Sequence, residues 1–75
     1  MEEQRDQTYR KHILTAIEEI ESFVQGMTFE HFESDIKTQR AVTRDLEIIG
    51  EAAKRLSEKF KDKHDTIPWR FIMMA

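Results

Sequence analysis

The chain has 75 residues, no cysteine and a net charge of −3, from 15 acidic and 12 basic side chains. This length allows one domain at most, and because so short a chain buries only roughly 60% of its unfolded surface, its stability is marginal without a partner subunit. The missing cysteines exclude disulfides and thiolate metal sites, and the interspersed charges form no basic stripe for bulk nucleic-acid binding. The sequence has no apolar run of about 18 residues that could span a membrane, and its polar N-terminus is unlike a signal peptide, so we expect a cytoplasmic protein.

The first predicted helix covers about residues 6–25. Its apolar side chains recur at helical spacing from Tyr9 to Val24. Either Asp6 or Thr8 could cap its start, and the residues before them are expected to fray. Gly26 follows directly, where the end of a helix favours a residue that tolerates positive φ.

A short helical element is predicted next, at residues 29–33. Thr28 is its expected cap, and Phe29 and Phe32 are expected to face inward together. Asp35 then caps the longest predicted helix, which runs to about residue 60. The apolar residues of this long helix keep to one face, at alternating gaps of four and three: Val42, Leu46, Ile49, Ala53, Leu56 and Phe60.

A further helix is predicted to start at Ile67-Pro68-Trp69-Arg70, because proline is favoured in a first turn. Only about two turns follow before Ala75, too few for a helix to be stable without packing. The pattern therefore predicts a single all-α domain over residues 1–75, with about three helices and the start of a fourth. We expect the apolar face of the long helix to lack its cover, and the chain to oligomerise or to fold loosely.

Asp45 is the most informative single residue, because the wheel of the long helix places it within the apolar face. A buried carboxylate needs a partner or a shifted pKa. One interpretation is a buried salt bridge or a bond to a neighbouring backbone N–H; the other is support for a site at the helix interface. Arg70 is a candidate partner in either case.

Three other residues of the long helix carry open alternatives. Gly50 lies mid-helix, at a cost of about 1 kcal/mol relative to alanine, and it predicts close approach of another backbone rather than chemistry. Arg44 and Glu51 share the polar face, which is either a solvated surface with weak ion pairs or a surface used by a partner. The three histidines, His12, His31 and His64, show no metal-ligand spacing and are interpreted as surface residues, so neither a metal nor a cofactor is expected.

The strings GMTFEHF (26–32), TQRAVTRDLEIIGEAAKRL (38–56) and IPWR (67–70) resemble a known family. They are similar to the HepT-like toxins of the HEPN superfamily, the toxin half of type VII HEPN–MNT toxin–antitoxin modules. The resemblance implies an up-and-down antiparallel helical bundle that pairs into a homodimer or higher oligomer. It also implies metal-independent RNA endonuclease activity and an MNT-type nucleotidyltransferase antitoxin as partner.

In this family the catalytic arginine and histidine lie on the helix that the IPW turn opens, at positions past Ala75. The resemblance therefore carries no catalytic residue onto this chain, which we expect to be truncated and inactive alone. Arg44, Asp45 and Glu51 carry over as supporting polar residues near the working surface of the bundle. Two alternatives to an inactive toxin fragment stay open: a non-catalytic module that dimerises or docks a nucleotidyltransferase, and a helical assembly domain with no toxin connection.

Overall fold

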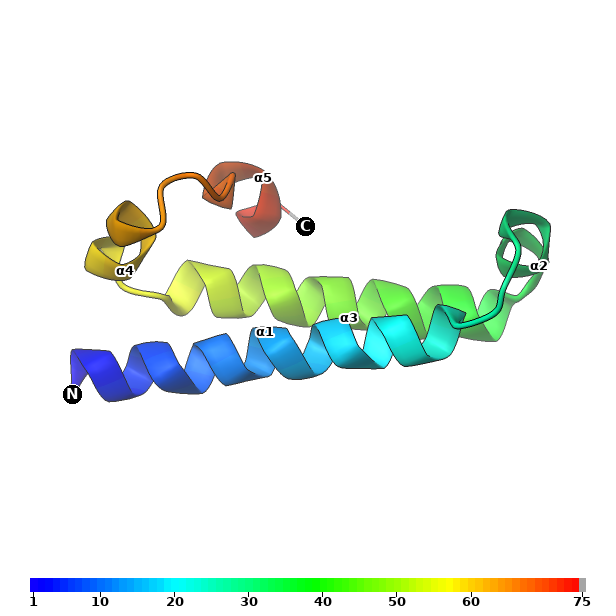
Figure 1. The fold of residues 1–75 in the computed structure, drawn as a ribbon, viewed down its shortest axis with the longest axis horizontal. Coiled ribbons are helices and arrows are strands. Elements are labelled where there is room, and N and C mark those ends of the chain that lie inside the picture. Colours follow the sequence, from blue (N-terminus) through cyan, green and yellow to red (C-terminus); the bar gives the residue numbers. More distant parts are fainter. Residues whose placement is uncertain (75) are drawn as a thin grey trace.

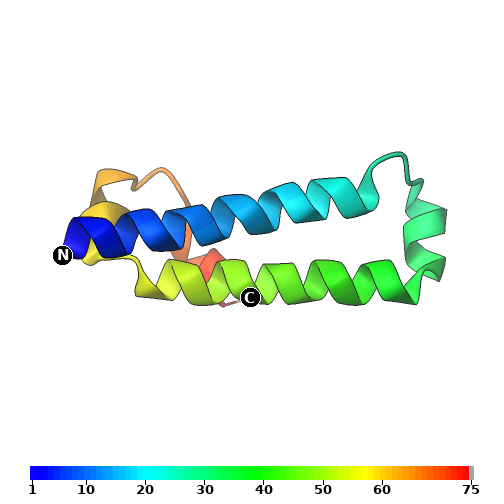
Figure 2. The same ribbon diagram turned by 90° about the horizontal axis from the view of Figure 1, so that it is seen from below.

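The computed structural model describes residues 1–74, which contain helices and connections and no strand. The helices are α1 (Glu2–Val24), α2 (Phe29–Ser34), α3 (Ile36–Arg55), α4 (Glu58–Lys63) and α5 (Trp69–Met73). The long helices α1 and α3 lie side by side and antiparallel, as Figures 1 and 2 show. The molecule measures 42 × 20 × 16 Å along its principal axes. The predicted all-α, up-and-down fold is confirmed. Within residues 1–74 no helix has the length and apolar character that crossing a membrane requires.

The start of α1 differs from the prediction. The helix begins at Glu2, with Met1 as N-cap and no capping side chain, so residues 2–5 are helical rather than frayed. Thr8 lies inside the helix and donates to the carbonyl oxygen of Gln4 at 3.0 Å. Asp6 is not a cap either, because its carboxylate is engaged by a residue far away in the sequence. At the other end of α1, Gly26 adopts φ +74°, as predicted.

The corner between α1 and α3 is built as the sequence predicted, with one exception. Thr28 caps α2 by accepting from the backbone N–H of His31 at 3.1 Å, and Asp35 caps α3 by accepting from Thr38 N–H at 3.1 Å. The exception is Phe29, whose side chain is 74% exposed. Phe29 lies in the first turn of α2. The prediction that Phe29 and Phe32 face inward together is therefore wrong.

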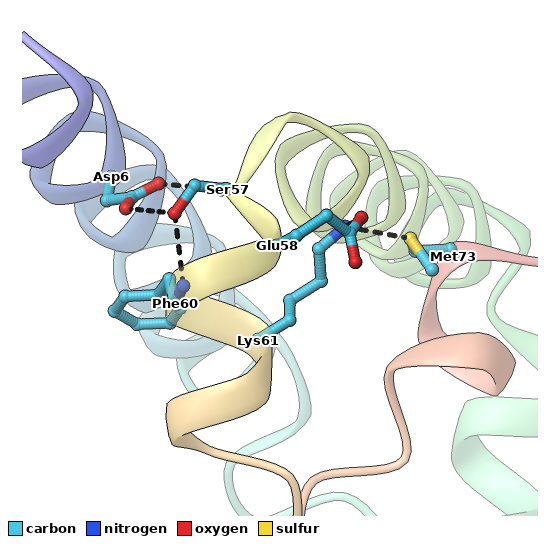
Figure 3. Close-up of polar contacts among 6 residues, drawn as sticks. All are labelled: Asp6, Ser57, Glu58, Phe60, Lys61 and Met73. Carbon is cyan, nitrogen blue, oxygen red and sulfur yellow. Dashed lines mark hydrogen bonds and ion pairs between the residues drawn. The ribbon is translucent and has the colours of Figure 1, made fainter.

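The long helix ends earlier than predicted, at Arg55 rather than near residue 60. Leu56 is extended (φ −65°, ψ 145°), and Ser57 caps a separate helix, α4, by accepting from the N–H of Phe60 at 3.1 Å. Asp6 binds both groups of Ser57: the backbone N–H donates to Oδ1 at 2.8 Å and the hydroxyl donates to Oδ2 at 2.6 Å (Figure 3). The N–H of Ser57, which a continuing helix would use internally, is thus taken by α1.

The last segment folds back onto α3. α5 begins after Pro68, as predicted, and packs on α3. The indole N–H of Trp69 donates to the carbonyl oxygen of His64 at 3.0 Å. Lys61 of α4 is 8% exposed and places its Nζ 3.6 Å from Met73 Sδ and 3.5 Å from a carboxylate oxygen of Glu58 (Figure 3). These contacts tie α4 and α5 together.

The core between α1 and α3 consists mainly of small side chains. Ala16, Ala52 and Ala53 are at most 3% exposed, so the two backbones approach closely. Leu56, 3% exposed, is the one large apolar side chain that is buried among residues 1–74. Leu46, predicted to lie on the apolar face, is 46% exposed. Other large apolar side chains are exposed as well, among them Leu14, Phe71 and Met74.

Candidate functional site

A groove of about 340 Å³ runs between α1 and α3, and it contains two of the residues that the sequence singled out. Arg44 and Glu51 both line it from α3. The apolar side chain of Ile48 and the methyl group of Ala52 lie between them. The groove is also lined by Tyr9 and His12 from α1 and by Glu47 and Arg55 from α3. We call it the α1–α3 groove.

One end of the α1–α3 groove carries a cluster of flat side chains. The rings of Tyr9 and His12, one helical turn apart on α1, meet edge to face with centroids 5.5 Å apart and planes at 86°. The guanidinium carbon of Arg55 lies 6.0 Å from the centre of the Tyr9 ring. Such a contact is worth about 0.5–1 kcal/mol at an exposed site. It connects α3 to α1 across the groove and places a cation beside two rings.

The charges of the groove are unevenly paired. Glu51 accepts from Lys54 Nζ at 3.3 Å, an exposed pair that contributes little to stability. In the part of the chain that the structure describes, neither Arg44 nor Arg55 has a carboxylate within 4.0 Å in an ion pair. Both arginines are exposed residues, so their guanidinium donors are available to a ligand.

Asp45 lies beside the α1–α3 groove rather than in it. It is 4% exposed, and its carboxyl group meets that of Glu19 on α1. The hydrogen bond with Asp45, its negative charge and burial together raise the pKa of Glu19, and the nearby charge of Arg44 opposes them. The negative charge of Asp45 therefore opposes ionisation of Glu19. Arg70, the candidate partner of Asp45 suggested by the sequence, forms no ion pair with it among residues 1–74 and is exposed.

A larger hollow of about 550 Å³ lies elsewhere, between the start of α1 and α4. Its basic side chains Arg10, Lys59 and Lys63 are matched in number by the acidic side chains Glu2, Glu3 and Asp6. This hollow contains none of the long-helix residues that the sequence singled out, Arg44, Asp45 and Glu51. We therefore regard the smaller α1–α3 groove, with its rings and unpaired guanidiniums, as the candidate site.

Comparison with known proteins identifies the family of this chain. The family model described as Ribonuclease HepT-like matches residues 13–74. The chain belongs to the ribonuclease HepT-like family. The resemblance noted in the sequence is confirmed.

Curated relatives agree with this assignment. The HepT-like chain is 53% identical over 62 residues to a probable ribonuclease HepT of Thermococcus cleftensis, covering 83% of the chain and 56% of the relative. It is 45% identical over 64 residues to a putative RNase of Caldanaerobacter subterraneus subsp. tengcongensis, covering 85% and 57%. A putative RNase of Methanocaldococcus jannaschii is 48% identical over 58 residues, covering 77% and 48%. The chain thus spans about half the length of these relatives. No solved structure matches it.

The histidines of the HepT-like chain are spread over its whole length. His12 is in the α1–α3 groove and His31 is in the last turn of α2. His64 is the C-cap of α4, and its ring centroid lies 4.6 Å from that of Phe60. Within residues 1–74 no three histidine or acidic side chains are placed to hold a metal ion.

Sequence reasoning missed three members of the groove: Tyr9, His12 and Arg55. A signal was present in their spacing. Tyr9 and His12 are three apart, and Arg55 lies eleven residues, or about three helical turns, after Arg44 on the same side of α3. Only the tertiary structure shows that the Tyr9 and His12 rings of α1 lie against this side of α3. Gly50 is buried on α3, and its role in close packing stays a prediction.

Proposed function

We propose that this chain is the toxin component, or part of it, of a type VII HEPN–MNT toxin–antitoxin system, and that its family chemistry is metal-independent cleavage of RNA. The family match over residues 13–74 carries the proposal, supported by relatives that bear ribonuclease names. The proposal places the single domain of residues 1–75 in the cytoplasm, where RNA and the nucleotidyltransferase antitoxin would meet it.

Within this system the 75 residues provide the scaffold, and the catalytic arginine and histidine are not among them. In HepT-like toxins that pair belongs to the helix that the IPW turn opens, and here this turn is followed by α5, Trp69–Met73. Of the histidines, His12 alone lines the α1–α3 groove, and it lies outside the residues that the family model matches. Arg44, Asp45 and Glu51 are proposed as supporting residues.

The test is a nuclease assay on the purified 75-residue chain with single-stranded RNA and EDTA. We expect no cleavage above that of a mock purification, because no family catalytic pair is present. The matched control is His12→Gln, which removes the one histidine of the groove. Cleavage by the unmodified chain that disappears in His12→Gln would show that the chain itself is a nuclease, and would overturn the scaffold assignment.

A second candidate function is a non-catalytic module that dimerises and docks the nucleotidyltransferase. The exposure of Phe71 (72%) and Met74 (75%) on or beside α5, and of Leu46 (46%) on α3, favours it, because a small monomer seldom leaves so many large apolar side chains in water. We expect the chain to sediment as a homodimer or higher oligomer and to co-purify with a nucleotidyltransferase encoded beside it. Phe71→Ser should weaken self-association, whereas Phe29→Ser, at the distant corner, should not. A monomer that retains no nucleotidyltransferase would exclude this module.

A further inference from the structure

We propose that the α1–α3 groove binds a short stretch of single-stranded RNA along α3, with a base at the Tyr9–His12–Arg55 end and backbone phosphates on Arg44 and Arg55. The choice of RNA as ligand rests on the proposed function. The position and the contacts rest on the geometry of the groove, which neither the family match nor the relatives assign. The two rings precede Ile13, where the family match begins.

The aromatic end of the groove suits a nucleobase. Proteins hold single-stranded bases by stacking them on aromatic rings or on guanidinium planes. Here Arg55 lies over the Tyr9 ring at 6.0 Å, and the His12 ring meets the edge of Tyr9. Tyr9 is half-buried, while His12 and Arg55 are exposed, so the platform is anchored on one side and open on the other. Because every base has a π-face, this contact tolerates any sequence.

The spacing of the two arginines selects a strand over a single nucleotide. Eleven residues of α-helix separate Arg44 from Arg55, which is about 16 Å along the axis. A single phosphate would meet both guanidiniums only if both side chains extended fully toward each other, whereas phosphates of different nucleotides in one strand need no such extension. Both side chains lack an ion-pair partner among the described residues and can form bidentate bonds to phosphate.

The two carboxylates between the arginines have a role in the same arrangement. Glu47 and Glu51 line the middle of the groove, where they repel phosphate and so favour its placement at the two ends. A carboxylate accepts hydrogen bonds from the ribose 2′-hydroxyl and from exocyclic amino groups. The Lys54 ammonium, 3.3 Å from Glu51, reduces the negative potential there. The groove should therefore prefer RNA to DNA of the same sequence.

The apolar lining of the groove completes the fit. Ile48, which is 37% exposed, supplies nearly all of the aliphatic surface between the polar ends, because Ala52 lines the groove but is only 3% exposed. The volume of about 340 Å³ lies near the lower limit of pockets that hold small molecules. It accommodates part of a strand and leaves the rest in solvent.

The proposal is tested by titrating the 75-residue chain with a short single-stranded oligoadenylate RNA at low salt, followed by amide chemical shifts and fluorescence anisotropy. We expect shifts concentrated on residues that line the groove. Arg44→Gln and Arg55→Gln should each weaken binding about threefold or more and lower the salt slope by about one. Arg55→Lys keeps the charge and should keep most of the phosphate contact. Arg70→Gln, which removes the same charge from exposed α5, is the matched control and should change affinity less than about twofold.

A second measurement compares RNA with DNA of the same sequence. We expect the chain to bind DNA more weakly than RNA. Glu51→Gln should reduce this difference in affinity. Shifts located elsewhere, with Arg44→Gln and Arg55→Gln no more harmful than Arg70→Gln, would refute the groove site and leave the ribonuclease assignment intact. Absence of RNA binding in a chain that still co-purifies with its nucleotidyltransferase would also refute the groove site alone. RNA bound in the groove of a chain that has no nucleotidyltransferase partner would support the site and count against the toxin–antitoxin assignment.

Discussion

The carboxylate of Asp6 holds Ser57 by two hydrogen bonds of 2.8 and 2.6 Å, joining the second turn of α1 to the first residue after the bend at the end of α3 (Figure 3). Both residues are buried, and 51 positions separate them in the chain. Ser57 uses its hydroxyl twice, donating to Asp6 and accepting from Phe60 N–H. One side chain thus ends α3, starts α4 and fixes both to α1.

Replacing Ser57 by alanine should destabilise the fold by about 1–2 kcal/mol, because the helix cap and the bond to Asp6 are lost together. Urea denaturation followed by circular dichroism measures the free energy of unfolding. Ser34→Ala is the matched control, since the Ser34 hydroxyl is exposed and only donates to the nearby His31 carbonyl. Equal effects of the two substitutions would contradict a stabilising role for the Ser57 hydroxyl, whether as helix cap or as partner of Asp6.

The same contact predicts a loss of stability in acid. The hydrogen bonds from the Ser57 hydroxyl and backbone N–H lower the pKa of Asp6, although burial opposes them. A carboxyl whose pKa is depressed by folding stabilises the protein above its unfolded pKa of about 3.9, and this contribution disappears as pH falls through the lower folded value. Asp6→Asn should therefore be less stable than the unmodified chain at pH 7, with the difference shrinking below about pH 4. A difference that stays constant with pH would contradict this account.

The Glu19–Asp45 pair predicts the opposite dependence on pH. Because Asp45 raises the pKa of Glu19, the contribution of Glu19 to stability is fully present below its unfolded pKa of about 4.3 and is lost as pH rises through the folded value. Glu19→Gln removes one of two facing charges and provides an amide that can donate to Asp45. It should raise the melting temperature at pH 7 and have little effect at low pH. Glu21→Gln, at another exposed glutamate of α1, should not reproduce the gain.

The turn after α1 depends on Gly26. Its φ of +74° strains any residue with a Cβ, and no atom lies within 4 Å of the place where that Cβ would be. The cost of Gly26→Ala is therefore backbone strain without a clash, about 1 kcal/mol. Gly26→Asn should cost less, because asparagine tolerates this region better. Thermal unfolding of both variants checks the order, and an alanine variant as stable as the unmodified chain would disprove it.

Local chemistry in the sequence was sufficient for most of the fold. Thr28 and Asp35 cap the helices that follow them because a short oxygen-bearing side chain satisfies the first free N–H groups wherever the chain runs. The positive φ of Gly26 and the helix start after Pro68 follow from residue type in the same way. The family resemblance came from the order of residues alone, and the family match confirms it.

Tertiary structure decided where α3 ends and where the polar residues point. Phe60 continues the apolar spacing beyond Leu56, so the sequence pattern runs on, but Asp6 takes the Ser57 N–H that a longer helix needs. No local rule identifies an acceptor 51 residues away. The partner of Asp45 is the carboxyl group of Glu19 on α1 rather than an arginine. Arg55 contacts the Tyr9 ring on α1, and this contact positions it in the groove. Sequence periodicity determines which face of a helix is apolar, whereas the partner of a buried or flanking polar group is set by the register between the two helices.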